Sequence, residues 1–185
     1  MIGPDFERVL EAARTGDPEG LERIYRELAP AVLGYLRGQG VADPEDLAGE
    51  VFVALVERIR GFRGDERALR SFVFTIAHHR LVDARRRERR RRDLAADPHE
   101  LAAAVGPVGD VAEEAMQALG TAWALRALDA LTPDQRAVVL LRVLGDLSVA
   151  EVARILGKTR GAVKTLQRRG LAALARSIER QAVSG

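Results

Sequence analysis

The side chains best placed to do chemistry lie near the C-terminus, on a predicted helix that begins close to residue 160. Arg160, Lys164 and Arg168 follow one another at intervals of four residues, so they share one helix face. Arginine and lysine on such a face donate hydrogen bonds to phosphates and to base edges in the major groove of DNA. The spacing therefore favours DNA binding, although a helical hairpin with a solvated basic face fits the same residues.

The segment around the start of this helix has the pattern of a helix-turn-helix. Ala153, Gly157, Val163 and Leu166 follow at steps of four, six and three residues. A small residue lets two helices approach, and a glycine takes a turn conformation that a side chain would resist. Two apolar residues then hold the second helix against the first. These positions predict a helix-turn-helix whose second helix carries the basic face.

A second basic feature is the run at residues 85–92, which holds seven arginines and one glutamate. Because these charges repel one another, the run gains from a polyanion that neutralises them. Arginine also forms bidentate hydrogen bonds with phosphate. The run predicts a nucleic-acid contact. By itself it does not distinguish DNA from RNA or a lipid surface, and a solvated, partly frayed helix end is the alternative.

Acidic side chains gather on another predicted helix, at residues 43–60. Asp46, Glu50 and Glu57 fall on one face of it. Carboxylates repel DNA phosphates, so this face fits a basic protein surface, or it is an ordinary solvated face. Asp46 and Glu50 lie one turn apart and could hold a metal in a nuclease, but no further ligands accompany them.

Composition argues against several other classes of function. The chain of 185 residues has no cysteine, which removes disulfides, thiol catalysis and cysteine metal sites. His78 and His79 point about 100° apart on a helix and cannot share a metal. Residues 1–7 lack the pattern of a signal peptide, and no apolar run approaches the roughly 20 residues of a membrane helix. We expect a cytoplasmic protein without membrane insertion, cofactor, metal or catalytic residues.

Charge is segregated along the chain, although the net charge is only +2. Residues 1–84 carry 11 basic and 15 acidic residues, and the arginine run follows them. Residues 93–118 carry six acidic residues and no lysine or arginine, whereas residues 119–185 carry 11 basic and five acidic residues. Such blocks indicate several charged partners on different faces rather than one small substrate.

The pattern of apolar and capping residues predicts an all-α chain. Apolar residues make up 47% and aromatic residues 4%, which favours helices packed through Leu, Val, Ala and Ile. Asp17 before Pro18 and Asp43 before Pro44 are helix starts, and capping boxes stand at 132–135 and 148–151. The predicted helices cover about 18–37, 44–60, 69 into the arginine run, 111–131, and two that follow the capping boxes.

Two domains are predicted from the break in this pattern. Residues 94–112 contain Pro98 and Pro107 and read as a flexible acidic linker. The first helical domain then covers residues 1–93, and the second covers residues 113–185.

Three segments together resemble a known family. They are residues 43–55 (DPEDLAGEVFVAL), residues 62–86 with SFVFTIAHHRLVDARR at their end, and residues 131–136 (LTPDQR) with the helix-turn-helix. In this order they resemble the extracytoplasmic-function sigma factors of the bacterial sigma-70 family, over nearly all of residues 17–180. The resemblance implies a non-enzymatic subunit of RNA polymerase that reads promoters, with a region 2-like bundle and a region 4-like helix-turn-helix domain.

The resemblance also implies three sets of site residues. Contacts with the clamp helices and flap of core RNA polymerase fall to Asp46, Leu47, Glu50, Val51, Phe52, Val139 and Leu140. Reading and opening of the −10 promoter element fall to Phe62, Arg63, Arg67, Phe72, His78, His79, Arg80, Arg85 and Arg86. Reading of the −35 element falls to Thr159, Arg160, Gly161, Lys164, Thr165, Gln167, Arg168 and Arg169.

This sequence departs from the family pattern at three positions of the first domain, and near Leu166 and Gln167 the recognition helix also differs from the commonest version. A tryptophan is usual where Phe72 stands, an asparagine where His79 stands, and a glutamine where Gly49 stands. These departures affect the −10 contacts and hence the promoter sequence. An anti-sigma factor is a further partner that the resemblance allows. The main alternative is a stand-alone helix-turn-helix regulator that binds a palindrome as a homodimer. The acidic first-domain helix and the lack of an obvious dimer helix argue against it.

Overall fold

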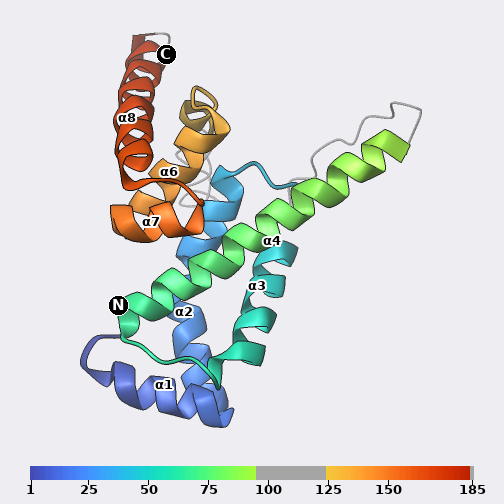
Figure 1. Ribbon diagram of the computed structural model, residues 1–185, viewed down its shortest axis with the longest axis vertical. Coiled ribbons are helices and arrows are strands. Elements are labelled where there is room, and N and C mark those ends of the chain that lie inside the picture. Colours follow the sequence, from blue (N-terminus) through green and yellow to red (C-terminus); the bar gives the residue numbers. More distant parts are fainter. Residues whose placement is uncertain (95–123, 184–185) are drawn as a thin grey trace, which may run out of the picture.

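The computed structural model describes residues 1–94 and 124–183, and the regular structure within these ranges is helical (Figure 1). The prediction of an all-α chain is therefore confirmed. Residues 124–128 are helical and precede α6. The elements are a 3-10 turn η1 (Gly3–Asp5) and the helices α1 (Phe6–Thr15), α2 (Pro18–Gly38), α3 (Pro44–Ile59), α4 (Glu66–Leu94), α6 (Pro133–Val143), α7 (Val149–Ile155) and α8 (Arg160–Val183).

Four helices begin where the sequence places a capping residue. The side chains of Asp17 and Asp43 each accept a hydrogen bond of 2.9 Å from a backbone N–H in the first turn of α2 and α3. The capping boxes that open α6 and α7 pair Thr132 with Gln135 and Ser148 with Glu151. Each cap satisfies N–H groups that a helix start leaves without partners, and a cap contributes about 1 kcal/mol to stability.

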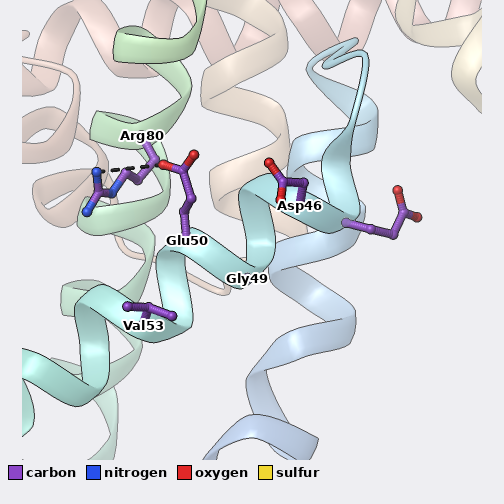
Figure 2. Close-up of a pocket in the computed structure, with 6 residues that line it drawn as sticks. Asp46, Gly49, Glu50, Val53 and Arg80 are labelled. Carbon is purple, nitrogen blue, oxygen red and sulfur yellow. Dashed lines mark ion pairs between the residues drawn. The ribbon is translucent and has the colours of Figure 1, made fainter.

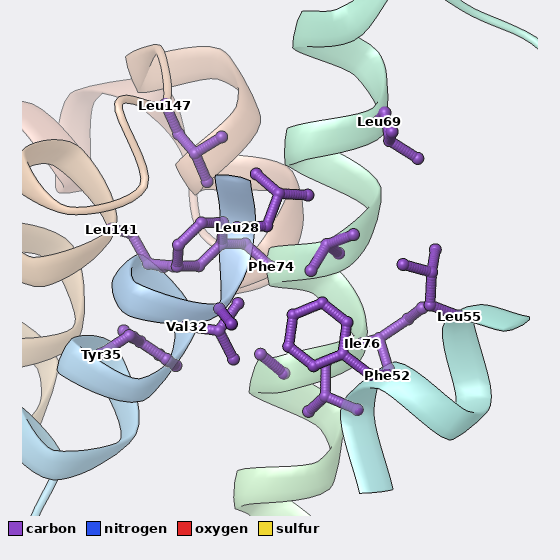
Figure 3. Packing of buried hydrophobic residues seen from close by; sticks show 14 of the residues in the cluster. Leu28, Val32, Tyr35, Phe52, Leu55, Leu69, Phe74, Ile76, Leu141 and Leu147 are labelled. Atoms are coloured by element: carbon purple, nitrogen blue, oxygen red, sulfur yellow. The ribbon is translucent and has the colours of Figure 1, made fainter. Parts of the chain in front are cut away.

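The first-domain core is formed by α2, α3 and α4, with α1 packed across α2. The predicted buried stripe of α3 is confirmed, because Leu47, Val51, Leu55 and Ile59 are all at most 4% exposed. Figure 3 shows Phe74 of α4, which is fully buried, beside α2 and Leu141 of α6, whereas Phe52 and Leu55 of α3 lie near Ile76 of α4. This packing fixes the direction of α4, whose arginine-rich end projects from the other helices (Figure 1).

The predicted second domain packs on the predicted first domain, and the two share one hydrophobic cluster. Within it, α6 and α7 lie against α8. Leu141 and Leu147 are fully buried and belong to the same hydrophobic cluster as Val32 of α2 (Figure 3). Accordingly α6 lies beside α2, and α7 lies beside α4. The sequence predicts two domains but contains no signal for this contact between them.

Helix α4 begins at Glu66, three residues before the predicted start at about Leu69. The side chain of Asp65 accepts a hydrogen bond from the N–H of Ala68 at 2.7 Å and so supplies an earlier cap. The predicted linker at 94–112, apart from Leu94 at the end of α4, and most of the predicted helix at 111–131 lie outside the described residues. In the part of the chain that is described, no helix is long and apolar enough to cross a membrane.

A partly buried polar pair joins α2 to α4. The hydroxyl of Tyr35 lies 2.9 Å from Nδ1 of His78, and Tyr35 is fully buried. Burial, followed by the positive charges of His79 and Arg85, lowers the pKa of His78 to about 4. A neutral His78 can accept the hydrogen bond from the Tyr35 hydroxyl.

This pair predicts that the free energy of unfolding falls as the pH is lowered from 6.5 towards 4. The unfolded state, in which His78 has its ordinary pKa of 6.5, binds more protons in this window. The contribution of His78 has a limiting slope of about 1.4 kcal/mol per pH unit. Urea unfolding of wild type, His78→Gln and His79→Gln between pH 4.5 and 7.5 checks this. The His78→Gln curve should be flatter than the other two. Three parallel curves would show that His78 is not held neutral.

Candidate nucleic-acid interface

The predicted helix-turn-helix is formed by α7 and α8. Gly157 has a φ of +61°, in the left-handed region that favours glycine. The N–H of Lys158 donates to the carbonyl of Ala153 at 2.9 Å and closes the end of α7. Thr159 Oγ1 accepts a hydrogen bond from the N–H of Ala162 at 3.2 Å and caps α8. Val163 is fully buried and holds the first turns of α8 against the rest of the domain.

The outer face of α8 is open to solvent. Gly170, on the inner face, is packed so closely that an added Cβ would lie 2.9 Å from Cγ2 of Val139. Of the eight predicted −35 residues, Gln167 is half-buried. The other seven are exposed: Thr159, Arg160, Gly161, Lys164, Thr165, Arg168 and Arg169. The helix therefore presents four basic side chains to a partner without any change in its own packing.

The predicted −10 residues fall into two groups. The first lies where the loop after α3 meets the start of α4. Phe62 and Phe72 stack there with ring centroids 5.5 Å apart and an interplanar angle of 28°. Arg63 is exposed and donates to the carbonyl of Phe62 at 2.8 Å. Arg67 is also exposed, five residues before Phe72. The group offers an aromatic surface with two guanidinium groups beside it, as stacking of an unpaired base requires.

The second group lies further along α4. His79 and Arg86 are exposed, whereas Arg85 is half-buried and donates to the backbone carbonyl and to Oε1 of Gln39, at 2.7 and 3.0 Å. His78 faces Tyr35. Its ring therefore lies in the packing between α2 and α4, which does not fit the prediction that it contacts DNA. Beyond this group the arginine run is exposed from Arg86 to Arg92.

An acidic hollow of about 630 Å³ lies beside α3 (Figure 2). Its lining residues are Glu45, Asp46, Gly49, Glu50, Val53 and Arg80. The hydrogen bond from Arg37 is the main reason that the pKa of Glu45 lies below its usual value. Glu50 lies 3.6 Å from a guanidinium nitrogen of Arg80 and 3.6 Å from one of Arg87. Glu50 thus joins the acidic face of α3 to the basic face of α4.

Five of the seven predicted polymerase contacts are buried. Leu47, Val51 and Phe52 are 4%, 0% and 9% exposed and belong to the first-domain core. Val139 is 4% exposed under α8, and Leu140 is 6% exposed against α2. Direct contact with a partner does not fit their burial. The α3 residues instead hold Asp46 and Glu50 in place at the surface.

Two further residues of the acidic face of α3 were not predicted from the sequence. Val53 and Val56 are 61% and 47% exposed on α3, beside the acidic residues. The sequence contains a signal that could have identified them, because both are apolar and neither belongs to the buried stripe of α3. The face of α3 therefore combines carboxylates with exposed apolar side chains, which is a composition suited to binding another protein.

Candidate metal ligands can be examined within residues 1–94 and 124–183. No group of three or more His, Cys, Asp or Glu side chains lies close enough there to hold an ion. Asp46 and Glu50, the two carboxylates considered for a nuclease, are joined in their hollow by Glu45 and the cation of Arg80. Glu50 is directed at Arg80 (Figure 2).

Two stretches of the chain match known families. Residues 24–91 match Sigma-70 region 2, and residues 121–174 match Sigma-70, region 4. The first stretch contains the acidic face of α3 and the predicted −10 residues, and the second contains the helix-turn-helix. The order of the two matches is the order predicted from the sequence motifs.

Several curated proteins are similar over most of the chain. SigD, an ECF RNA polymerase sigma factor of Mycobacterium tuberculosis, is 30% identical over 179 residues, which cover 92% of this chain and 82% of SigD. ShbA, an ECF RNA polymerase sigma factor of Streptomyces griseus, is 30% identical over an alignment that covers 94% of this chain and 93% of ShbA. BldN of Streptomyces coelicolor is 33% identical over 172 residues, but this chain spans only 64% of BldN.

The fold is also found in solved structures. The sigma factor RpoE of Bartonella quintana, in complex with the anti-sigma factor NepR, aligns with a TM-score of 0.67 and 19% identity, over 85% of this chain and 96% of that one. CnrH, in complex with the cytosolic domain of CnrY, aligns with a TM-score of 0.63 and 19% identity, over 92% of this chain and 95% of the CnrH chain. An all-helical chain with sigma-70 regions 2 and 4 in this order is a sigma factor. This chain belongs to the extracytoplasmic-function sigma factors of the sigma-70 family.

Proposed function

We propose that this protein binds core RNA polymerase through α3, reads and opens the −10 element with α4 and the loop before it, and reads the −35 element with α8. The observation that carries this proposal is that one chain presents a face of carboxylates and exposed valines on α3 and a separate exposed basic face on α8. A regulator that binds DNA alone has no need of the first face. An enzyme would need a reactive constellation that the described surfaces do not offer, so we propose that the chemistry belongs to the polymerase.

The polymerase face is proposed to consist of Asp46, Glu50, Val53 and Val56. Exposed carboxylates attract a basic partner and set the rate and orientation of docking. Exposed valines supply apolar area that gains free energy when it leaves water. Glu50 is already paired with Arg80 and Arg87, so it links the bound polymerase to the helix that faces DNA.

The −10 element is proposed to bind along the start and middle of α4. Extruding one base from a duplex costs a few kcal/mol, which stacking on an aromatic side chain helps to offset. Phe62 and Phe72 lie where such a base could be held, with Arg63 and Arg67 beside it. The exposed arginines of the run then neutralise phosphates along the strand. His78 has no part in this proposal, because it is paired with Tyr35.

The −35 element is proposed to meet the exposed face of α8 in the major groove. Arg160, Lys164 and Arg168 read base edges, and the remaining exposed residues position the helix on the backbone. We further propose that the protein acts in the cytoplasm, where bacterial polymerase and chromosome lie. It is also proposed to accept an anti-sigma factor, as the matched RpoE does with NepR.

Selection of DNA from a random duplex pool tests the proposal. It should be done with the protein alone, with core polymerase alone, and with both together. The two together should enrich two separate sequence blocks at a fixed spacing, and neither component alone should enrich them. Enrichment of a palindrome by the protein alone would instead favour the stand-alone regulator.

A further inference from the structure

The loop between α3 and α4, which carries part of the proposed base-stacking surface, is held by a side chain of α1. Nη2 of Arg14 donates a hydrogen bond of 2.6 Å to the backbone carbonyl of Phe62. Arg14 lies in the last turn of α1, and its Nη1 pairs with Oε2 of Glu11 on the same helix at 3.1 Å. The guanidinium group therefore joins α1 to a loop that lies 48 residues further along the chain.

Arg63 also donates to the carbonyl of Phe62, at 2.8 Å, but it cannot fix the loop in the same way. Its other hydrogen bond, of 3.1 Å, goes to the carbonyl of Arg60, directly after α3. Both acceptors lie within three residues of Arg63, so these bonds tighten the turn locally. Arg14 approaches from another helix, and its hydrogen bond therefore sets the position of the turn within the domain.

The ring of Phe62 has little room to move on its own. A Cβ added to Gly64 would lie 3.1 Å from Cζ of Phe62 and 2.7 Å from Cβ of Ala68, so the ring packs closely over the loop. The same ring stacks on Phe72 of α4. A shift of the Phe62 backbone would press the ring against the loop or change its stacking on Phe72. The position of this carbonyl thus determines the position of the aromatic surface.

Helix α1 is packed firmly enough to hold the loop in place. Phe6, Val9, Leu10 and Ala13 are all at most 6% exposed. A Cβ added to Gly20 of α2 would lie 2.5 Å from the backbone nitrogen of Ala13, so the two helices are in close contact. Figure 1 shows α1 lying across one end of α2. A side chain in the last turn of α1 therefore starts from a fixed point.

Stability alone does not account for an arginine at position 14. Its side chain is 21% exposed, and its Nε is buried without a hydrogen-bond partner among the described residues. A buried N–H without a partner costs free energy, and an aliphatic side chain of similar length would avoid that cost. Such a side chain could not donate to the carbonyl of Phe62. The hydrogen bond to the loop is thus the contact that requires a donor here.

We propose that Arg14 is a positioning residue for capture of the extruded −10 base, and that α1 belongs to the −10 reading machinery although it lies outside both family matches. Arg14 acts through Phe62 and does not itself contact DNA. It holds the loop so that the rings of Phe62 and Phe72 stay where the base stacks. The proposal rests on the proposed function, because it requires that a base stacks on these rings.

Binding of single-stranded DNA by the holoenzyme tests this role. The probes are the non-template −10 strand of the sequence that the holoenzyme enriches from the random pool, and a set of the same strand with one abasic nucleotide at each position in turn. The loss of affinity at each position measures what that base contributes. Arg14→Met removes the donors and keeps an unbranched side chain. Arg8→Met is the control, because Arg8 lies on the same helix with its side chain 76% exposed and paired with Asp5.

The wild-type holoenzyme should lose at least roughly 5-fold in affinity when the captured base is absent, because stacking of one base is worth roughly 5- to 100-fold. Arg14→Met should bind the intact strand at least roughly 5-fold more weakly than wild type, and it should lose less than about 2-fold when the captured base is absent. The losses at all other positions should be the same in both proteins. Arg8→Met should match wild type on every strand.

Two results would overturn the role of Arg14. One is an equal weakening of Arg14→Met on the intact strand and on every abasic strand, which is what a merely structural defect would give. The other is a loss at the captured position as large as that of wild type. Arg14→Gln, which is too short to reach the loop, replaces Arg14→Met if circular dichroism shows that variant to be unfolded. If no abasic position weakens binding by the wild-type holoenzyme, the proposed base capture is itself wrong.

Discussion

Reversing the charge of Asp46 and Glu50 to lysine should weaken binding to core RNA polymerase by at least roughly 100-fold, because like charges placed opposite a basic partner cost several kcal/mol. Both carboxylates line the hollow beside α3. Lysine at position 50 would also repel Arg80 and Arg87, which now pair with Glu50. The affinity can be measured by competition with a labelled sigma factor for core polymerase.

The matched control for this experiment is Glu19→Lys. Glu19 is exposed in the first turn of α2, as Asp46 is in the first turn of α3, so both changes oppose a helix dipole equally. Asp46→Lys alone separates the docking effect from the loss of the Glu50 ion pairs. Binding of −35 duplex DNA should be the same in all variants. Unchanged polymerase affinity in the folded double variant would exclude α3 as the docking face.

Replacing Lys164 and Arg168 with alanine should lower transcription from a −35-dependent promoter by at least roughly 30-fold, because each lost base contact costs about 1–3 kcal/mol. Both side chains are exposed on α8, so their removal leaves the packing around Val163 unchanged. Multiple-round transcription with a saturating amount of each variant on core polymerase measures the effect without a contribution from polymerase affinity.

Arg176→Ala is the control for the recognition helix. It removes the same kind of charge from α8, at an exposed position beyond the residues proposed to enter the groove. Its transcription should stay close to that of wild type. The contradicting result would be an equal loss of transcription in the double variant, Lys164→Ala with Arg168→Ala, and in the control, Arg176→Ala. In that case α8 would act through its general charge and not through contacts with bases.

The helices and most of their inward faces could be predicted from sequence because their signals are local. Asp17 and Asp43 cap the helices they precede, and every fourth residue from Leu47 to Ile59 is buried. The same local signals placed the turn at Gly157, whose φ of +61° suits glycine. The exposed basic face of α8 follows from that turn, since Val163 fixes which side of the helix is buried.

The remaining features depend on contacts between distant residues. Gly38 and Leu140 are each unremarkable in their own helix, and only the packed structure brings them together. The pairing of His78 with Tyr35 likewise needs the packing of α4 on α2, so the sequence reading assigned His78 to the surface. For Leu47, Val51 and Phe52, the family motif marked the right helix but not which of its faces is free.

The most direct test of the central claim is transcription in vitro with core RNA polymerase on genomic DNA fragments, with and without the full-length protein, followed by sequencing of the 5′ ends. A sigma factor should produce new start sites that share one upstream sequence near −35 and one near −10. Lys164→Ala with Arg168→Ala should remove those starts. Identical start sites with and without the protein would contradict the account.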